Sequence, residues 1–279
     1  MNLWQYLGEP FAQHALLAGT LVAITSGLIG PFIVTRKMAF AVHGTAELSF
    51  TGAAAGLLVA GDPVVGALIG SLVVATAIGF LGVRDRERDS AIGVILAFGL
   101  GAGVFLLSLY HGFATAATNI LFGQIFGVSN GQLLLLLAVA VGVLVAMAVL
   151  YRPLLFASVD PEVAEARGVR LRLVGLLFLF VLALTVTEAA QIVGTLLVLS
   201  LAITPAAAAQ RLSSRPAVVT SLSVIFALLA CDGGLLASLQ SNTVKASVFV
   251  TTFSFGIYVV ARIAGSVLHL GRPSRQVAH

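Results

Sequence analysis

His43 and Glu47 lie four residues apart in the segment FAVHGTAELSF, residues 40 to 50, which is flanked by long apolar sequence. Side chains at positions i and i+4 share one face of a helix, so an imidazole and a carboxylate are expected side by side. These two groups suit Zn²⁺ and, less specifically, Mn²⁺. The pair therefore predicts a site for a divalent metal ion on one helix face.

The composition of the chain places this pair inside a membrane. Its 279 residues are 59% hydrophobic and 9% charged, with a mean hydropathy of +1.09. A soluble domain carries about 25% charged residues, so too few polar side chains are present to cover a water-soluble globule. The composition predicts an all-α polytopic membrane protein. The formal net charge of +4 requires no nucleic-acid partner, because membrane proteins collect basic residues in their cytoplasmic loops.

The apolar segments predict about nine membrane-spanning helices, each needing roughly 20 mostly apolar residues. The predicted spans are 11–35, 38–60, 64–83, 90–110, 131–151, 173–188, 191–210, 217–239 and 244–264. With the N-terminus outside and the C-terminus in the cytoplasm, fourteen of the fifteen Lys and Arg fall on the cytoplasmic side, Lys245 being the exception. Residues 1–265 are thus predicted to form one transmembrane domain, followed by a basic cytoplasmic tail, 266–279.

An ionisable side chain within a span needs a reason, because a charge at the bilayer centre costs about 2.5–3.5 kcal/mol. His43 and Glu47 follow Lys37 by six and ten residues, which places them about 9–15 Å into the membrane at 1.5 Å per residue. One explanation is a transport site; the other is an internal hydrogen bond between the two side chains that serves helix packing. Intramembrane ionisable residues are usually functional, which favours the transport site.

Two other acidic residues fall within or at the ends of spans. Glu188 and Gln191 are expected at the outer hairpin between the sixth and seventh spans, either where an ion enters or merely facing water. Asp232 lies toward the outer end of the eighth span, where an ion pair with Lys245 is expected. His111, in an outer loop, is a candidate for metal access or an interfacial residue.

Glycine-rich segments do not indicate nucleotide binding here. SGLIG (26–30) and GLGAG (99–103) lie inside apolar helices, where small residues allow close helix packing. No Walker A sequence is present. The chain is therefore not expected to hydrolyse ATP itself, nor to hold a permanently bound cofactor.

The longest charged connection, residues 152–172, predicts a short helix. Asp160 suits the N-cap, Pro161 the first helical position and Glu162 the positive end of the helix dipole. Gly168 can adopt the left-handed conformation that ends a helix. The helix is either a solvated loop element or a docking surface for a cytoplasmic partner.

Five segments, in order along the chain, resemble the membrane permease subunits of the zinc- and manganese-type ABC importers. They are VTRKMAFAVHGTAELSFTGAAAG, RERDSAIGVILAFGLGAGV, NILFGQIFGVS, LLFASVDPEVAEARGV and QIVGTLLVLSLAITPAAAAQRLS. The resemblance runs from about residue 11 to residue 264. One departure concerns the metal preference: family members commonly have an Asp and a His at the spacing of His43 and Glu47, so carboxylate and imidazole are in swapped order here.

The resemblance implies a homodimer of permeases in the bacterial cytoplasmic (inner) membrane, in contact with membrane lipid. It also implies cytoplasmic ATP-binding subunits and an extracytoplasmic metal-binding protein that delivers the ion. Residues 160–168 would form the coupling helix that contacts the ATPase, through Asp160, Pro161, Glu162, Glu165 and Gly168. His43 and Glu47 would form the transient transport site, with Glu188 as a further candidate ligand. Two copies of the pair across a dimer axis would supply four ligands, the usual number for zinc.

These observations leave rival functions open. The favoured one is an ATP-driven importer of divalent transition-metal ions, with zinc ranked ahead of manganese and iron(II) as a further alternative. A proton-coupled secondary metal transporter, with Glu188 or Asp232 carrying protons, is the runner-up. The halves of the chain show no convincing internal repeat, whereas such transporters commonly have one.

Overall fold

The computed structural model describes residues 8–81, 85–111, 113–195, 197–241 and 244–270. Within these ranges the regular structure is helical and no strand occurs, which confirms the predicted all-α class. The helices are α2 (Pro10–Thr35), α3 (Ala39–Ala60), α4 (Pro63–Leu81), α5 (Asp85–Ser108), α6 (Phe113–Phe122), the 3₁₀ turn η1 (Ile125–Gly127), α7 (Asn130–Val159), α8 (Pro161–Ala166), α9 (Leu171–Val193), α10 (Val198–Ala202), α11 (Thr204–Leu212), α12 (Pro216–Ser238) and α13 (Ala246–Leu270).

Six of the nine predicted spans coincide with helices that are long and apolar enough to cross a membrane: α2, α4, α7, α9, α12 and α13. Helix α3 has 22 residues but includes His43 and Glu47, which lower its hydropathy. The apolar part of α5, Ile92–Ser108, and the α10–α11 pair are shorter. The count of nine therefore stays a prediction.

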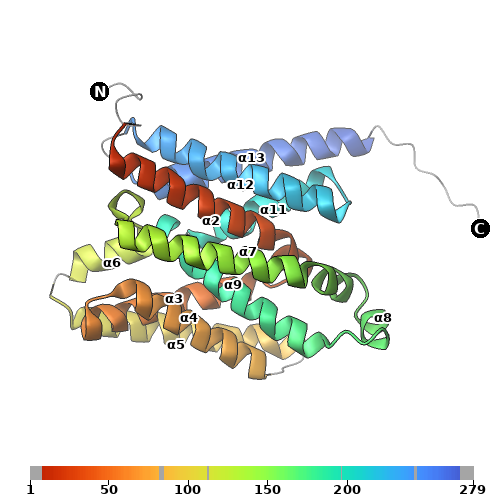
Figure 1. The fold of residues 1–279 in the computed structure, drawn as a ribbon, viewed down its shortest axis with the longest axis horizontal. Coiled ribbons are helices and arrows are strands. Elements are labelled where there is room, and N and C mark those ends of the chain that lie inside the picture. Colours follow the sequence, from red (N-terminus) through yellow and green to blue (C-terminus); the bar gives the residue numbers. More distant parts are fainter. Residues whose placement is uncertain (1–7, 82–84, 112, 196, 242–243, 271–279) are drawn as a thin grey trace, which may run out of the picture.

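Helices α2 and α9 form the centre of the bundle. In each, 67% of the apolar window is buried, against 22% to 39% in the other four long apolar helices. Helices α3, α4 and α5 lie on one side of this centre, while α11, α12 and α13 lie on the other (Figure 1). Helix α9 packs against α4 and α3, and α2 packs against α12, so the two sides are joined through the central pair.

Glycines allow close helix contacts in both groups. A Cβ added at Gly27 would lie 2.6 Å from Cα of Val224 in α12, and one at Gly99 would lie 2.8 Å from a Leu48 methyl carbon in α3. At Gly27 the near atom belongs to the backbone and cannot turn aside, whereas at Gly99 the Leu48 side chain would have to shift. The packing interpretation of the two glycine-rich segments is confirmed.

The boundary between the sixth and seventh predicted spans was wrong. Helix α9 continues to Val193, and Gly194 ends it with φ +89°. The backbone N–H of Gln124 donates to Gln191 O (3.2 Å), and that of Thr195 donates to Ile120 O (3.3 Å). These bonds tie the α6–η1 connection to the end of α9. The predicted continuous span 191–210 is instead two half-helices, α10 and α11, with Pro205 in the first turn of α11.

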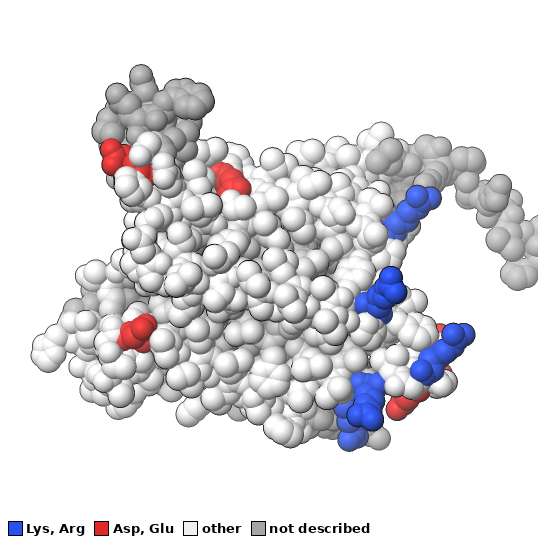
Figure 2. Space-filling view, in the orientation of Figure 1, with Lys and Arg blue, Asp and Glu red and all other residues white. Residues whose placement is uncertain are grey.

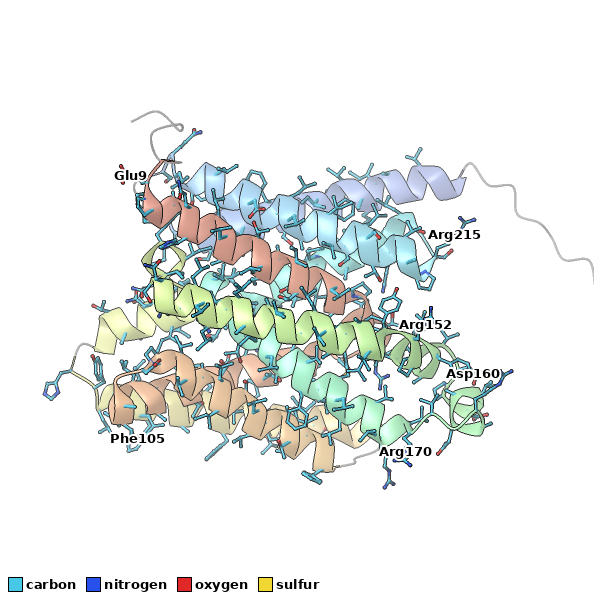
Figure 3. All side chains as sticks on the ribbon, in the orientation of Figure 1. Glu9, Phe105, Arg152, Asp160, Arg170 and Arg215 are labelled. Atoms are coloured by element: carbon cyan, nitrogen blue, oxygen red, sulfur yellow. The ribbon has the colours of Figure 1, made fainter. Side chains whose placement is uncertain are left out.

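Basic residues gather at one end of the bundle. On the face shown in Figure 2 the Lys and Arg side chains cluster at one end. Arg152, Arg170 and Arg215 lie at that end, and Glu9 lies at the other (Figure 3). This asymmetry agrees with the predicted orientation, which is itself still a prediction. Residues 266–270, predicted as the start of the tail, continue α13; residues 271–279 lie outside the described residues.

Candidate functional site

His43 and Glu47 lie on α3 where that helix packs against α4, α5 and α9. Helix α3 is held to α5 by Thr51, whose hydroxyl donates to the carbonyl oxygen of Gly99. Glu47 is only 2% exposed, and His43 is partly exposed. The structure therefore places the predicted pair inside the protein, on one helix.

Both side chains have donor atoms that the protein leaves unpaired. His43 Nδ1 and Glu47 Oε2 are buried and have no hydrogen-bond partner among the described residues. Buried polar atoms in native proteins are nearly always bonded, so each unpaired one calls for an explanation. The alternative of an internal hydrogen bond does not account for these two atoms. An imidazole nitrogen and a carboxylate oxygen free of partners are able to bind a metal ion.

The pair alone does not complete a metal shell. Among the described residues, no group of three or more His, Cys, Asp or Glu side chains is placed to hold an ion. Glu47 faces the interior of its own chain, so sharing it with a second copy across a dimer axis would require the surrounding helices to move. The four-ligand shell stays a prediction.

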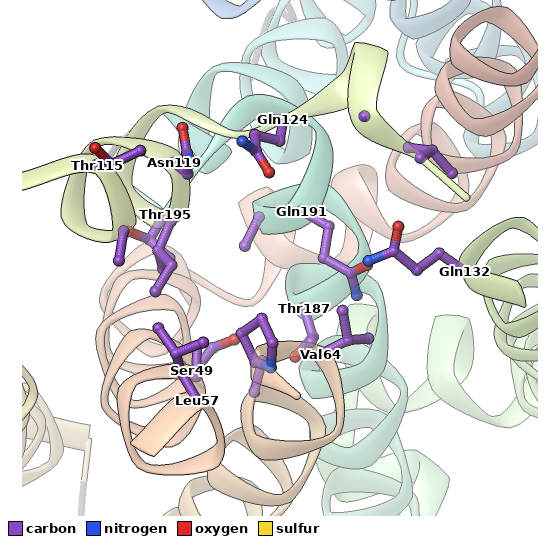
Figure 4. A pocket seen from close by; sticks show the side chains of 18 of the residues that line it. Ser49, Leu57, Val64, Thr115, Asn119, Gln124, Gln132, Thr187, Gln191 and Thr195 are labelled. Carbon is purple, nitrogen blue, oxygen red and sulfur yellow. The ribbon is translucent and has the colours of Figure 1, made fainter. Parts of the chain in front are cut away.

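A cavity of about 420 Å³ lies at the end of the bundle away from the arginines, and Figure 4 shows its lining. Polar but uncharged side chains converge on it from α3, α6, α7, α9 and the connections between them. They include Ser49, Asn119, Gln124, Gln132, Thr187, Gln191 and Thr195. No Asp, Glu, Lys or Arg is among its described lining residues.

Neither His43 nor Glu47 is among the described residues that line the cavity. Ser49 of α3 lines it and follows Glu47 by two residues, which is about 3 Å along the helix axis but on a different helix face. Gln191 Nε2 and Thr195 Oγ1, which also line it, are buried without a hydrogen-bond partner among the described residues. Nε2 is a hydrogen-bond donor, so it is the amide and hydroxyl oxygens of the lining that could contact an ion.

Several cavity residues gave no signal in the sequence. Asn119 and Gln124 lie in a segment without a recognisable polar pattern, and only folding of the α6–η1 connection against α9 brings them to the cavity. Thr187 and Gln191 did carry a signal, since their spacing of four residues places them on one face of α9. His111, a candidate for metal access, also lines the cavity.

Glu188 does not occupy the position predicted for it. It lies within α9, is 1% exposed and accepts a hydrogen bond at Oε2 from the hydroxyl of Thr25 in α2 (3.3 Å). The prediction of an outer hairpin was wrong, because α9 extends five residues beyond Glu188. Its second oxygen, Oε1, is buried without a hydrogen-bond partner among the described residues. Glu188 does not line the cavity.

The predicted ion pair between Asp232 and Lys245 was also wrong. Asp232 accepts hydrogen bonds from the Thr20 hydroxyl at 3.3 Å and 3.2 Å. Lys245 donates to the carbonyl oxygen of Thr118 and lies 5.3 Å from the centre of the Phe122 ring. Asp232 therefore joins α12 to α2, while Lys245 contacts α6.

The predicted short helix is confirmed as α8, and its cytoplasmic location stays a prediction. Asp160 caps it, with Oδ1 accepting from the backbone N–H of Val163 (3.0 Å), and Pro161 occupies its start. Gly168 has φ +84° and lies in the turn that ends α8. Ala164 is buried, whereas Pro161, Glu162 and Glu165 are exposed. The helix thus lies at the arginine-rich end of the bundle with its charged face uncovered (Figure 3).

Comparisons with known proteins agree with this arrangement. The model of the ABC 3 transport family matches residues 9–265. The manganese transport system membrane protein MntC of Halalkalibacterium halodurans is 32% identical over 83% of this chain and 80% of its own length. The high-affinity zinc uptake system membrane protein ZnuB of Haemophilus influenzae is 26% identical over 82% of this chain and 88% of its own length.

A solved structure shares the fold over almost the full length of both chains. It is described as PsaBC from Streptococcus pneumoniae in complex with Fab. The similarity has a TM-score of 0.85 with 26% sequence identity, and it covers 97% of this chain and 99% of that one.

Proposed function

The chain belongs to the ABC 3 transport family, and from that premise we propose that it is the permease subunit of an ATP-driven importer of divalent transition-metal ions. ATP is hydrolysed in separate cytoplasmic subunits, and the permease acts as a homodimer in the bacterial cytoplasmic membrane. An extracytoplasmic metal-binding protein delivers the ion. The ion is the substrate, and the chain needs no resident cofactor. Family membership disfavours the proton-coupled secondary transporter.

The observation that carries this proposal is the pair of unpaired donor atoms, His43 Nδ1 and Glu47 Oε2, on one face of a helix whose next turns line the polar cavity. Neutral oxygen atoms replace water around an ion without holding it as strongly as a carboxylate does. An ion that enters the cavity therefore meets weak ligands there, while the imidazole and carboxylate of α3 lie outside its lining. Transport requires binding strong enough for entry and weak enough for release, which a two-residue site satisfies better than a closed cage.

Zinc and manganese are the two candidate ions, each with one supporting observation. An imidazole and a carboxylate form a mixed nitrogen and oxygen set that zinc accepts tetrahedrally. Manganese prefers more oxygen ligands, which the amide and hydroxyl lining of the cavity offers. Relatives named for manganese and for zinc uptake both match the chain. The ligand types of the pair favour zinc, and iron(II) is a third alternative.

Energy coupling is assigned to α8. The helix is capped at Asp160, presents Glu162 and Glu165 to solvent, and is anchored to the bundle through buried Ala164. Helix α8 is exposed and lies next to the start of α9. A movement of the ATPase against α8 would therefore displace α9, the helix that lines the cavity. Copurification of the chain with an ATP-binding subunit, and its loss on disrupting α8, tests this assignment.

The transport proposal is tested by the metal content of cells that lack the protein. Cells complemented with the intact chain are expected to accumulate zinc or manganese under limitation of that metal, and cells carrying Glu47→Gln or His43→Ala are expected not to. Asp232→Asn serves as the matched control, since it neutralises another acid within a helix that lies away from the cavity. Equal accumulation in all these strains, at equal amounts of protein in the membrane, would refute the transport site.

A further inference from the structure

A groove of about 810 Å³ lies at the arginine-rich end of the bundle, where the end of α4 meets the start of α9. Arg36, Arg170 and Arg172 line it, and no acidic side chain is among its described lining residues. The groove shares no lining residue with the polar cavity, which lies toward the opposite end. Three guanidinium groups around one groove are a strong concentration of positive charge for a chain with 9% charged residues.

Two of the three arginines are available to a ligand. Arg170 and Arg172 are exposed, and their side chains have no hydrogen-bond or ion-pair partner among the described residues. Arg36 is anchored instead: its Nη1 donates to the Ser158 hydroxyl (3.4 Å), and its guanidinium lies 5.9 Å from the centre of the Phe178 ring. Arg36 thus adds a fixed positive charge to the inner wall, while the other two reach outward.

The remainder of the groove is apolar. Phe80, at the end of α4, is 80% exposed, and Leu173, in the first turn of α9, is 49% exposed. Leu176 also lines the groove. Helices α4 and α9 approach closely at this level, because a Cβ added at Gly79 would overlap a Leu176 methyl group. Both helices are apolar enough to cross a membrane, and these side chains lie at the ends of the two apolar helices, next to the arginines.

We propose that this groove binds an anionic phospholipid. Its phosphate lies between Arg170 and Arg172, near Arg36, and its acyl chains pack along Phe80, Leu173 and Leu176. Basic pockets between membrane helices on the cytoplasmic side suit anionic head groups, and guanidinium groups bind phosphate through paired hydrogen bonds. A free phosphate would use the arginines but leave the apolar part unexplained. The ATPase subunit would approach from the cytoplasm at α8, whereas Phe80 and Leu173 are exposed apolar side chains on two helices apolar enough to cross a membrane.

The experiment uses the full-length chain purified in neutral detergent. Its thermal stability and bound lipid, the latter by native mass spectrometry, are measured during titration with dioleoyl phosphatidylglycerol, with dioleoyl phosphatidylcholine, or with glycerol 3-phosphate. The test variant is Arg170→Gln with Arg172→Gln. The matched control is Arg152→Gln with Arg215→Gln, which removes two arginines from the same end of the bundle but outside the groove.

We expect phosphatidylglycerol to stabilise the intact chain and the control variant, and to bind the test variant about 10- to 30-fold more weakly. Phosphatidylcholine and glycerol 3-phosphate should have little effect on any of them. Phe80→Ala should also weaken phosphatidylglycerol binding, because it shortens the apolar wall. Arg172→Lys retains the charge and should keep most of the binding, which separates lost charge from misfolding.

Three results would overturn the proposal. The first is equal binding of phosphatidylglycerol by the test and control variants. The second is equal stabilisation by glycerol 3-phosphate and the lipid, which would make the groove a simple anion site. The third is normal lipid binding by the test variant together with loss of a copurifying ATP-binding subunit, which would assign the arginines to a protein interface.

Discussion

Gly70→Ala adds one methyl group where α4 contacts the segment of α3 that carries Glu47. A Cβ at Gly70 would lie 2.5 Å from the carbonyl oxygen of Leu48, the residue next to Glu47, and 3.0 Å from Cα of Gly52. Both contacts are with backbone atoms of a helix. Rotation of a side chain therefore cannot relieve the overlap, and the two helices must separate.

The size of the effect follows from that separation. Ordinary contact begins at 3.4 Å, so α3 and α4 must move apart by up to 0.9 Å at this level. Overpacking an interior costs about 1–3 kcal/mol, and replacing Gly by Ala inside a helix recovers up to about 1 kcal/mol. Because the overlap is with backbone atoms, the cost should fall in the upper part of that range, about 2–3 kcal/mol. We therefore expect a net loss of about 1–2 kcal/mol in the free energy of unfolding, or about 2–8 °C in Tm. Metal uptake should also fall, because the displaced segment carries Glu47.

The matched control is Gly101→Ala, the same substitution on α5 at a position where a Cβ meets no atom within 4 Å. It should leave stability unchanged or raise it slightly. Thermal unfolding of the purified chain in detergent and cellular metal content are compared for the two variants. If Gly70→Ala unfolds at the same temperature as Gly101→Ala and supports normal uptake, the close approach of α3 and α4 does not position the site.

Three other predictions concern single side chains. Asp160→Ala removes the α8 cap and should destabilise that helix by about 0.5–2 kcal/mol, which should weaken copurification with the ATP-binding subunit. Val163→Pro should weaken copurification further. Unchanged copurification in both variants would mean that α8 does not contact the ATPase. Thr25→Val removes the hydroxyl that donates to Glu188 (3.3 Å) and should cost about 0.6–1.7 kcal/mol in detergent unfolding; no loss would mean that this hydrogen bond does not hold α2 to α9. Gln191→Leu removes an amide, including the carbonyl oxygen that could contact an ion, from the cavity and should reduce uptake at low metal concentration about fivefold, the equivalent of one hydrogen bond, without lowering stability. Unchanged uptake by that variant would exclude the amide as an ion ligand.

Features that depend on a few neighbouring residues were predictable from the sequence. The cap at Asp160 and the left-handed turn at Gly168 involve bonds within one or two helical turns, so residue type and spacing predict them. The shared face of His43 and Glu47 follows from helical periodicity alone. Apolar run length predicted six helices that match the structure, because each must be apolar over the width of the bilayer whatever it packs against.

Features that depend on which helices meet were decided only by the tertiary structure. Glu188 and Asp232 are both isolated acids in apolar sequence, yet one bonds to Thr25 and the other to Thr20, more than 160 residues away in the chain. The cavity forms because backbone bonds join the α6–η1 connection to the end of α9, and the groove of arginines forms because α4 ends beside the start of α9. Hydropathy identifies a membrane helix but does not determine its neighbours, since nearly every side chain on it is apolar. In such a chain the few polar atoms acquire their partners, or remain unpaired for an ion, only when the helices have packed.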